Sequence, residues 1–266
     1  MYRSFYSLVK VPFTKELKTS EAFASSGFTE LSARLEYLKK SRGIGLVTGE
    51  PGVGKTLTLR SFCDSLSPSL YKVVYFPLST LTVQDFYRGL AAELGEEPRY
   101  RKVDLFYQIQ KSILTLYKER KITPVLVLDE LQMARDAFLC DLSILFNFGM
   151  DSENPFILIL SGLPYLSSKL ALNQHRPLFQ RIIMKYKLEA LNRQEVADYL
   201  KHHMKLAGAA YDIFTEPALE AIFSLSCGWP RMVNQLATQC LIYGCQTRKE
   251  HIDEETVRIA AEEIGI

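Results

Sequence analysis

One octapeptide guides the interpretation of this chain: Gly49-Glu50-Pro51-Gly52-Val53-Gly54-Lys55-Thr56. It fulfils the G-x-x-x-x-G-K-[ST] pattern in full, and it lies between an apolar stretch at 43–48 and a helix-like stretch at 56–66. Glycines in such a loop let backbone N–H groups converge on phosphate oxygens, and the following helix presents the positive end of its dipole. The octapeptide therefore predicts a strand, a phosphate-binding loop and a helix, in that order.

The loop also carries side chains for a bound nucleotide. We expect Lys55 to reach the β- and γ-phosphates of ATP, and the hydroxyl of Thr56 to ligate Mg²⁺. A chance glycine-rich turn is the alternative, and the order of strand, loop and helix disfavours it. The residues expected to bind ATP with its Mg²⁺ are Gly49, Glu50, Pro51, Gly52, Val53, Gly54, Lys55, Thr56, Leu57 and Asp129.

A second apolar strand, at 125–128, ends in the acidic pair Asp129 and Glu130. A parallel sheet presents side chains to a ligand at its carboxyl edge, where such a pair would lie. We expect Asp129 to hold Mg²⁺ through water and Glu130 to polarise the attacking water. Two acids after a strand are more often a solvated turn, but the phosphate loop earlier in the chain favours the catalytic interpretation and argues for hydrolysis as well as binding.

Alternating strand and helix patterns up to about residue 190 predict an α/β fold with a parallel five-stranded sheet flanked by helices. After residue 191 the pattern is helical only, with Gly208 and Gly228 as breakers. We therefore expect an α/β core with an N-terminal aromatic segment at 1–189 and a small all-helical lid at 190–266. The expected strands are 43–48, 72–78, 124–128, 156–161 and 186–188. The expected lid helices are 193–206, 216–225, 231–243 and 253–263.

Composition sets outer limits on the kind of protein. The 266 residues are 47% hydrophobic and 23% charged, which allows a sizeable buried core. Apolar runs are far shorter than the roughly 20 residues of a membrane span, and the N-terminus lacks a signal-peptide core, so we expect a cytoplasmic protein without a membrane partner. The five cysteines form no CxxC pair, which suggests neither a zinc site nor a disulfide framework. A net charge of +2 says little about partners.

Three further positions are candidates for sensing or stabilising the reacting phosphate. Ser161 ends the strand at 156–161, where its hydroxyl could bond the γ-phosphate or the lytic water, or simply belong to a strand-end turn. Arg181 precedes the last expected strand and could reach the γ-phosphate of a neighbouring subunit, with Arg176 as a rival. Arg231 opens a lid helix that begins with proline and would point from the lid toward the nucleotide. Each arginine could instead be a surface residue.

Several stretches carry a resemblance to one protein family. They are Phe5-Tyr6-Ser7-Leu8 with Pro12-Phe13, 48–56, Asp129-Glu130-Leu131-Gln132, Leu145-Phe146-Asn147-Phe148, Gln180-Arg181-Ile182, Gly228-Trp229-Pro230-Arg231 and Leu241-Ile242-Tyr243-Gly244. Together they resemble AAA+ ATPases of the ExeA/TniB type, which accompany DDE transposases and are similar to the transposition regulators TnsC, IstB and MuB. The likeness covers nearly the whole chain. The phosphate loop and acidic pair are common to all AAA+ proteins, so the N-terminal block and the lid narrow the branch.

The resemblance implies a function that composition does not show. It implies an ATP-dependent homo-oligomer, a ring or a helical filament, that assembles on double-stranded DNA of tolerant sequence, marks a target, and recruits or activates a DDE transposase. By analogy the N-terminal aromatic block would pack around the adenine, with ordinary packing of a terminal segment as the alternative. The chain departs from the branch at Leu131-Gln132, where Ala-His is frequent, and at Gly162-Leu163, where Gly-Gln is frequent. These departures leave open which residue acts as the sensor.

A basic segment is the candidate DNA contact. Residues 99–121 carry seven basic side chains against two acidic ones, with four aromatic side chains interleaved. Such a surface could follow a phosphate backbone without reading bases, although a solvated helix face is the alternative. The candidate contacts are Arg99, Arg101, Lys102 and Lys111.

Two other functions fit parts of the sequence. The N-terminal block also resembles assembly ATPases of secretion systems, which normally carry a membrane span and an envelope domain beyond the lid. A signalling switch or protein-remodelling module that binds no nucleic acid is the third hypothesis. Salt-insensitive behaviour toward DNA would favour that third hypothesis.

Overall fold

The computed structural model describes residues 2–14, 16–77 and 82–266. Backbone contacts divide the chain into two compact units. The α/β unit comprises Glu30–Pro51 and Lys55–Leu188, and the helical unit comprises Met1–Thr29, Gly52–Gly54 and Glu189–Ile266. Each has its own hydrophobic core.

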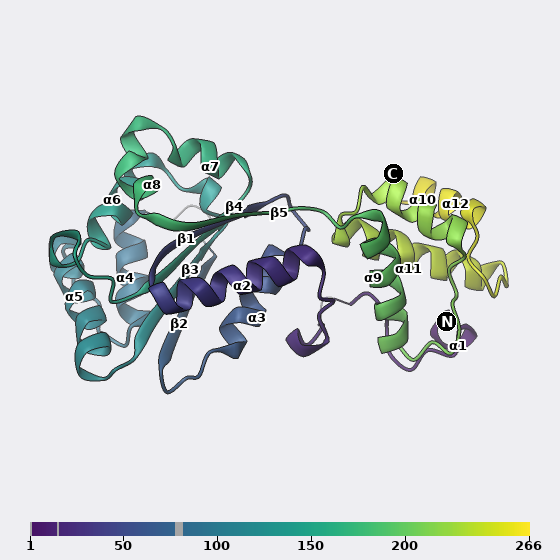
Figure 1. Ribbon diagram of the computed structural model, residues 1–266, viewed down its shortest axis with the longest axis horizontal. Helices are drawn as coiled ribbons and strands as arrows, with labels where there is room; N and C mark the ends of the chain where they lie inside the picture. Colours follow the sequence, from purple (N-terminus) through teal and green to yellow (C-terminus); the bar gives the residue numbers. More distant parts are fainter. Residues whose placement is uncertain (1, 15, 78–81) are drawn as a thin grey trace. The chain divides into compact units, whose positions relative to one another are not determined.

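The α/β unit is built on a parallel sheet, as the sequence predicts. Among the described residues the sheet has five strands in the order β2-β3-β4-β1-β5, and all paired neighbours run parallel. The carboxyl ends of the strands therefore share one edge of the sheet (Figure 1). The strands are β1 (Gly43–Gly49), β2 (Tyr71–Pro77), β3 (Thr123–Asp129), β4 (Ile157–Gly162) and β5 (Ile182–Leu188).

Four of the expected strands agree with the observed bounds to within one residue at their described ends, and the fifth begins earlier than expected. The last residue of the expected strand 72–78, Leu78, lies outside the described residues. β5 begins at Ile182, four residues before the expected strand 186–188. β5 is an edge strand, and at its start buried and exposed side chains alternate, as Met184 and Lys185 do. Its sequence therefore lacks the continuous apolar run by which β3 and β4 are recognised.

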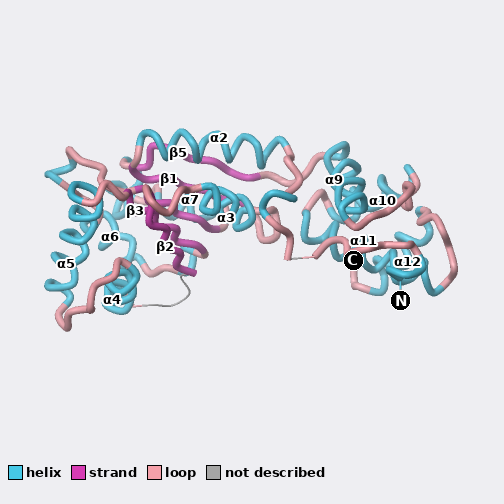
Figure 2. Tube along the Cα trace, turned by 90° about the horizontal axis from the view of Figure 1, so that it is seen from below, coloured by secondary structure: helices cyan, strands magenta, loops and turns pink. Residues whose placement is uncertain are grey.

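Helices cover both faces of the sheet. Residues of β3 and β4 such as Leu126 and Leu158 belong to one core with α4, α5, α6, α7 and α8. Alternate residues point to the opposite face, where a Cβ added to Gly45 of β1 would lie 2.7 Å from Leu38 of α2. The helices of this unit are α2 (Ser26–Ser41, in the unit from Glu30 onward), α3 (Lys55–Ser65), α4 (Val83–Glu93), α5 (Lys102–Leu114), α6 (Asp136–Leu145), α7 (Tyr165–Leu170) and α8 (Arg176–Gln180). In Figure 2, α2 and the group from α4 to α6 lie on different sides of the strands.

The helical unit is a bundle whose helices begin at recognisable caps. The Asn192 side chain accepts from the backbone N–H of Glu195, whose own carboxylate accepts from the N–H of Asn192, so both orphan donors are satisfied. The side chains of Thr215 and Asp253 each accept one backbone N–H at the start of two further helices, and Pro230 occupies the first turn of another. The helices are α9 (Arg193–Leu206), α10 (Glu216–Ser226), α11 (Pro230–Gln246) and α12 (Glu254–Glu263).

The N-terminal aromatic block packs in the helical unit, whereas the sequence interpretation placed it with the α/β core. After the short α1 (Tyr2–Phe5), the buried Tyr6 donates a hydrogen bond to the carbonyl of Lys249 at 2.9 Å. Gly244 makes room for this ring, because a Cβ there would lie 2.3 Å from the Tyr6 hydroxyl. Phe13 stacks against His203 with ring centroids 5.6 Å apart. The N-terminal block thus packs against α11 at the space that Gly244 leaves, a contact that spacing along the sequence does not reveal.

No helix within the described part of the chain combines the length and apolar character that a bilayer crossing requires. The assignment of residues 190–266 as a functional lid stays a prediction.

His203 of α9 gives the helical unit a pH-dependent stability. Its ring packs against the rings of Phe13 and Tyr199, the residue is 4% exposed, and its Nε2 has no hydrogen-bond partner among the described residues. Burial, with a smaller contribution from neighbouring His202, lowers the pKa of His203 to about 4. Because an unfolded histidine titrates near pH 6.5, protons bind preferentially to the unfolded chain between these values.

We therefore expect the stabilising contribution of neutral His203 to be complete above about pH 6.5 and to disappear as pH falls toward 4. The free energy of unfolding should drop by about 2 kcal/mol between pH 7 and pH 5 from this residue. His203→Phe keeps an aromatic ring against Phe13 and Tyr199 and removes the titration. Urea unfolding of the parent and this variant at both pH values measures the difference. An equal drop in the two proteins would contradict the prediction.

Candidate active site

The candidate active site lies at the carboxyl edge of the sheet. β1 leads into the phosphate loop, β3 ends at Asp129, and Ser161 lies near the end of β4. In the pairing of β1 with β4, Val47 lies opposite Ser161. The topology therefore gathers motifs that are far apart in the sequence.

Two glycines of the phosphate loop have positive φ values. Gly52 and Gly54 have φ values of 83° and 110°, which residues with a Cβ rarely adopt. α3 begins at Lys55, directly after the loop. The Lys55 ammonium is buried and donates hydrogen bonds to the carbonyls of Gly49 and Glu50 at 2.7 and 3.0 Å. The expected strand, loop and helix are thus present, and the lysine lies folded over the loop.

Asp129 accepts four hydrogen bonds from described residues of the site. One carboxylate oxygen accepts hydrogen bonds from the hydroxyls of Thr56 at 3.2 Å and Tyr75 at 3.1 Å. The other accepts from the Ser161 hydroxyl at 2.7 Å and from the backbone N–H of Glu130 at 3.0 Å. Asp129 is only 2% exposed, so these donors offset the cost of removing its carboxylate from water. Ser161 is thus engaged with Asp129 in this structure.

Tyr75 belongs to this site although it carries no sequence motif. It comes from the edge strand β2, next to β3, and reaches across to Asp129. Burial, followed by the charge of Asp129, raises the pKa of Tyr75 to about 12. The phenol therefore stays protonated at neutral pH and can keep donating to the carboxylate. Only the pairing of β2 with β3 reveals this contact.

Glu130 leaves the strand in a left-handed conformation, with φ 55° and ψ 32°. This turn separates its exposed side chain from the buried Asp129. The carboxylate of Glu130 accepts a hydrogen bond from the carboxamide of Gln132 at 2.5 Å. The sequence marked Gln132 only as a departure from a family pattern, and its contact with Glu130 arises from the tight turn.

The donor set fits Mg²⁺ and a nucleotide phosphate. Thr56 and Asp129 offer a hydroxyl and a carboxylate oxygen 3.2 Å apart, and oxygen ligands are what Mg²⁺ prefers. Within the described residues no group of three or more His, Cys, Asp or Glu side chains could hold a metal, so phosphate oxygens and water would complete the shell.

The two arginine candidates of the α/β unit have different surroundings. The Arg181 guanidinium donates to Asp151 at 2.7 Å and to the carbonyl of Ser143 at 2.8 Å, and its side chain is 16% exposed. Arg176, at the start of α8, is exposed. Arg181 is therefore paired within its own chain in this structure.

Arg231 lies in the helical unit, in the first turn of α11. Its backbone N–H donates to the carbonyl of Gly52 at 3.3 Å, within the same unit. A Cβ at Gly52 would lie 2.7 Å from the Cβ of Arg231, which gives a second reason for glycine at this position. The Arg231 residue is exposed.

The basic segment lies on and around α5. Arg99, Arg101 and Lys111 are exposed, as are the interleaved Tyr100 and Tyr107, at 83% and 65%. Lys102 differs from the other basic candidates. Its ammonium donates to both oxygens of Asp141, at 2.9 and 2.7 Å, and this pairing reduces its attraction for a phosphate.

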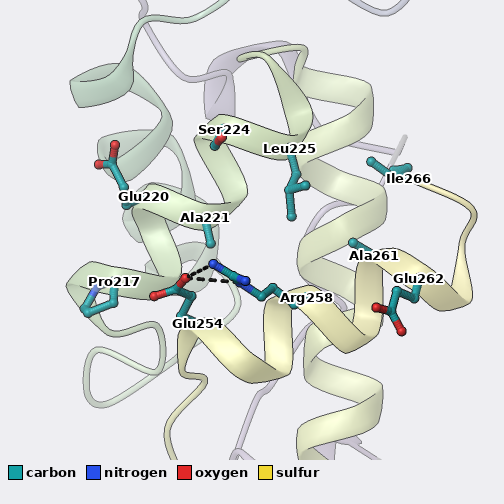
Figure 3. A pocket seen from close by; sticks show the side chains of 10 residues that line it. All are labelled: Pro217, Glu220, Ala221, Ser224, Leu225, Glu254, Arg258, Ala261, Glu262 and Ile266. Carbon is teal, nitrogen blue, oxygen red and sulfur yellow. Dashed lines mark hydrogen bonds and ion pairs between the residues drawn. The ribbon is translucent and has the colours of Figure 1, made fainter.

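The helical unit also contains a groove, which is lined by other residues than those described above. It has a volume of about 620 Å³ and lies between α10 and α12 (Figure 3). Ala221 and Leu225 contribute apolar surface, and Arg258 pairs with Glu254 at 2.6 Å. None of the site residues expected from the sequence lines it.

A five-stranded parallel sheet among the described residues, a complete phosphate loop at the end of β1 and an acidic pair at the end of β3 define a P-loop nucleotide hydrolase. A sequence profile of the AAA domain matches residues 38–170, half of the chain. The chain therefore belongs to the AAA domain family, which is a family of ATP hydrolases.

Relatives extend the likeness beyond that domain. The chain is 30% identical over 269 residues to general secretion pathway protein A of Aeromonas hydrophila, and the match covers 100% of this chain and 49% of the relative. The chain thus spans about half the length of this curated relative.

Solved structures share the fold. Cdc6p from Pyrobaculum aerophilum aligns with a TM-score of 0.65 and 16% identity, covering 98% of this chain and 70% of that one. The ORC1 protein of Aeropyrum pernix in complex with DNA gives 0.64 and 15%, covering 91% and 66%. The RuvB Holliday junction branch migration motor of Thermotoga maritima gives 0.59 and 20%, covering 89% and 67%. At these identities the likeness shows the fold alone.

Proposed function

We propose that this chain is an ATP-dependent AAA+ regulator of DNA transposition. It assembles as a homo-oligomer, a ring or a helical filament, on double-stranded DNA in the cytoplasm, selects a target, and recruits or activates a DDE transposase. ATP hydrolysis serves as a switch or timer. The observation that carries the proposal is the group of exposed basic and aromatic side chains on α5 and just before it, which contains no base-reading motif: Arg99, Tyr100, Arg101, Tyr107 and Lys111.

The nucleotide chemistry assigns a role to each residue around Asp129. Lys55 compensates the charge of the β- and γ-phosphates, and Thr56 with Asp129 holds Mg²⁺, which supplies further charge compensation when bound. Glu130 orients the attacking water and accepts its proton while the bond to the γ-phosphorus forms and ADP leaves. Ser161 contributes by orienting Asp129, to which it donates, and its role as a direct sensor is the alternative.

Arginines complete the site in this proposal. Arg231 links the lid to the phosphate state of the nucleotide. Arg181 acts in trans on the γ-phosphate of a neighbouring subunit, which requires its release from Asp151, and Arg176 is the rival because it is exposed. The likeness to the ORC1 protein in complex with DNA supports the proposal, because it shows that a protein with this fold can bind DNA.

A secretion-system assembly ATPase is the second candidate function. The 30% identical relative is named general secretion pathway protein A, and the likeness covers the whole of this chain. That function has no need for a DNA-binding face, so DNA affinity discriminates between the two candidates. A switch that binds no nucleic acid is distinguished in the same way.

The first test concerns the nucleotide. Lys55→Ala should abolish tight ATP binding, because the phosphate charge is left uncompensated, whereas Glu130→Gln should keep binding and lower turnover by roughly 10²- to 10⁴-fold. Equilibrium binding and phosphate release measure both effects, with Lys40→Ala, a change of an exposed lysine on α2, as control. Turnover by Glu130→Gln at the parent rate would show that Glu130 is not the base.

The second test mixes subunits. Arg181→Ala and Lys55→Ala proteins should each be inactive, and their mixture should regain part of the ATPase activity, because the intact arginine of one completes the intact loop of the other. The same mixture is prepared with Arg176→Ala. Recovery only with Arg176→Ala would move the trans role to Arg176 and leave Arg181 structural. No recovery with either variant at any ratio would exclude a trans arginine in this segment.

The third test concerns DNA. In Arg99→Ala/Arg101→Ala/Lys111→Ala, affinity should fall for all duplex sequences alike, and the slope of log affinity against log salt should shrink by about 0.9 per lost phosphate contact. Lys102→Ala is the matched control, and a smaller effect is expected because Asp141 already pairs with Lys102. Binding is measured at several salt concentrations with a non-hydrolysable ATP analogue. Absence of DNA binding by the parent would sink the transposition proposal.

A further inference from the structure

The carboxamide of Gln132 connects two parts of the active site. Its Nε2 donates to the Glu130 carboxylate at 2.5 Å, and its Oε1 accepts from the backbone N–H of Leu163 at 3.2 Å. Leu163 directly follows the last residue of β4. One buried side chain, 7% exposed, thus joins the acid after β3 to the backbone after β4.

The surroundings of Gln132 hold this arrangement in place. A Cβ on Gly162 would lie 2.7 Å from Gln132 Oε1 and 2.8 Å from a methyl of Leu166, so glycine leaves the space that the carboxamide occupies. The Tyr165 hydroxyl donates to the Gln132 carbonyl at 3.3 Å. Both the backbone and the side chain of Gln132 are therefore tied to the segment that begins at the end of β4.

The carboxamide of Gln132 meets both hydrogen-bonding requirements of this position. A carboxamide has a donor end and an acceptor end, and here the donor faces a carboxylate while the acceptor faces an N–H. Glutamate would keep the acceptor and place a second carboxylate beside Glu130. Methionine, of similar length, would provide neither hydrogen bond.

We propose that Gln132 is a positioning residue that fixes the Glu130 carboxylate relative to the end of β4, so that displacement of Gly162 and Leu163 is passed to the base. The inference rests on the proposed role of Glu130 in hydrolysis. In this proposal Gln132 is the residue that connects β4 to the base Glu130. Ser161, which also belongs to β4, donates its hydroxyl to Asp129 instead. A shift of about 1 Å in a reacting group can cost 100-fold in rate, so such a link is sufficient to control turnover.

The test compares Gln132→Met, Gln132→Glu and Gly162→Ala with the parent. Each variant should lower kcat by about 10- to 100-fold, while KM for ATP and the Kd of a non-hydrolysable analogue change by less than about twofold. Gly162→Ala leaves both Gln132 and Glu130 unsubstituted, and its methyl group crowds the Gln132 carboxamide and a methyl group of Leu166. Gln110→Met is the matched control, since Gln110 donates to the carbonyls of Leu145 and Asn147 and does not touch Glu130. It should keep the parent kcat.

The outcomes separate this inference from the proposed function. Parental kcat in both Gln132 variants, with Glu130→Gln inactive, would overturn the positioning role and leave the function of Glu130 intact. Losses of kcat matched by equal losses of nucleotide affinity and thermal stability would show a merely structural residue and would also overturn it. If Gln132→Met does not fold, Gly162→Ala and Gln132→Glu decide by the same comparison of kcat with KM. Parental turnover by Glu130→Gln would instead refute the proposed hydrolytic site.

Discussion

The buried carboxylate of Asp129 accepts hydrogen bonds from Thr56, Tyr75, Ser161 and the backbone N–H of Glu130. These donors come from the start of α3, from β2, from β4 and from the turn after β3. A charged group in the interior is costly unless it is hydrogen-bonded, so the arrangement of these elements is coupled to a single side chain. The parallel sheet makes the coupling possible, because it brings the ends of its strands to one edge.

Adjacent acids acquire different surroundings from one change in backbone direction. Asp129 ends β3 inside the sheet, while the left-handed conformation of Glu130 turns its side chain outward to Gln132. A residue with a Cβ rarely adopts positive φ, and the conformation persists where surrounding contacts hold it. Here the contacts of Asp129 on one side and of Gln132 on the other fix the turn. Division of labour between metal holding and water activation would follow from this geometry.

The helical unit, which includes the N-terminal block, has a second hydrophobic core of its own. Tyr6 and Phe13 pack among its helices. Gly244 of α11 leaves space for the Tyr6 ring, and the buried His203 of α9 packs against Phe13. The uncharged state of His203 is a consequence of that packing, because the imidazolium would lose its hydration without gaining a partner.

The sequence alone determined the phosphate loop, the acidic pair and the parallel α/β class, because these follow from covalent order. A loop of fixed spacing lies between an apolar strand and a helix, and acids directly follow a buried strand. Tertiary structure alone decided that Tyr75 and Ser161 converge on Asp129, that Gln132 joins Glu130 to Leu163, and where the N-terminal block packs. These contacts depend on which strands are neighbours and on the space left by Gly162 and Gly244. The spacing of residues along the chain does not predict contacts between residues that come together only in the folded protein.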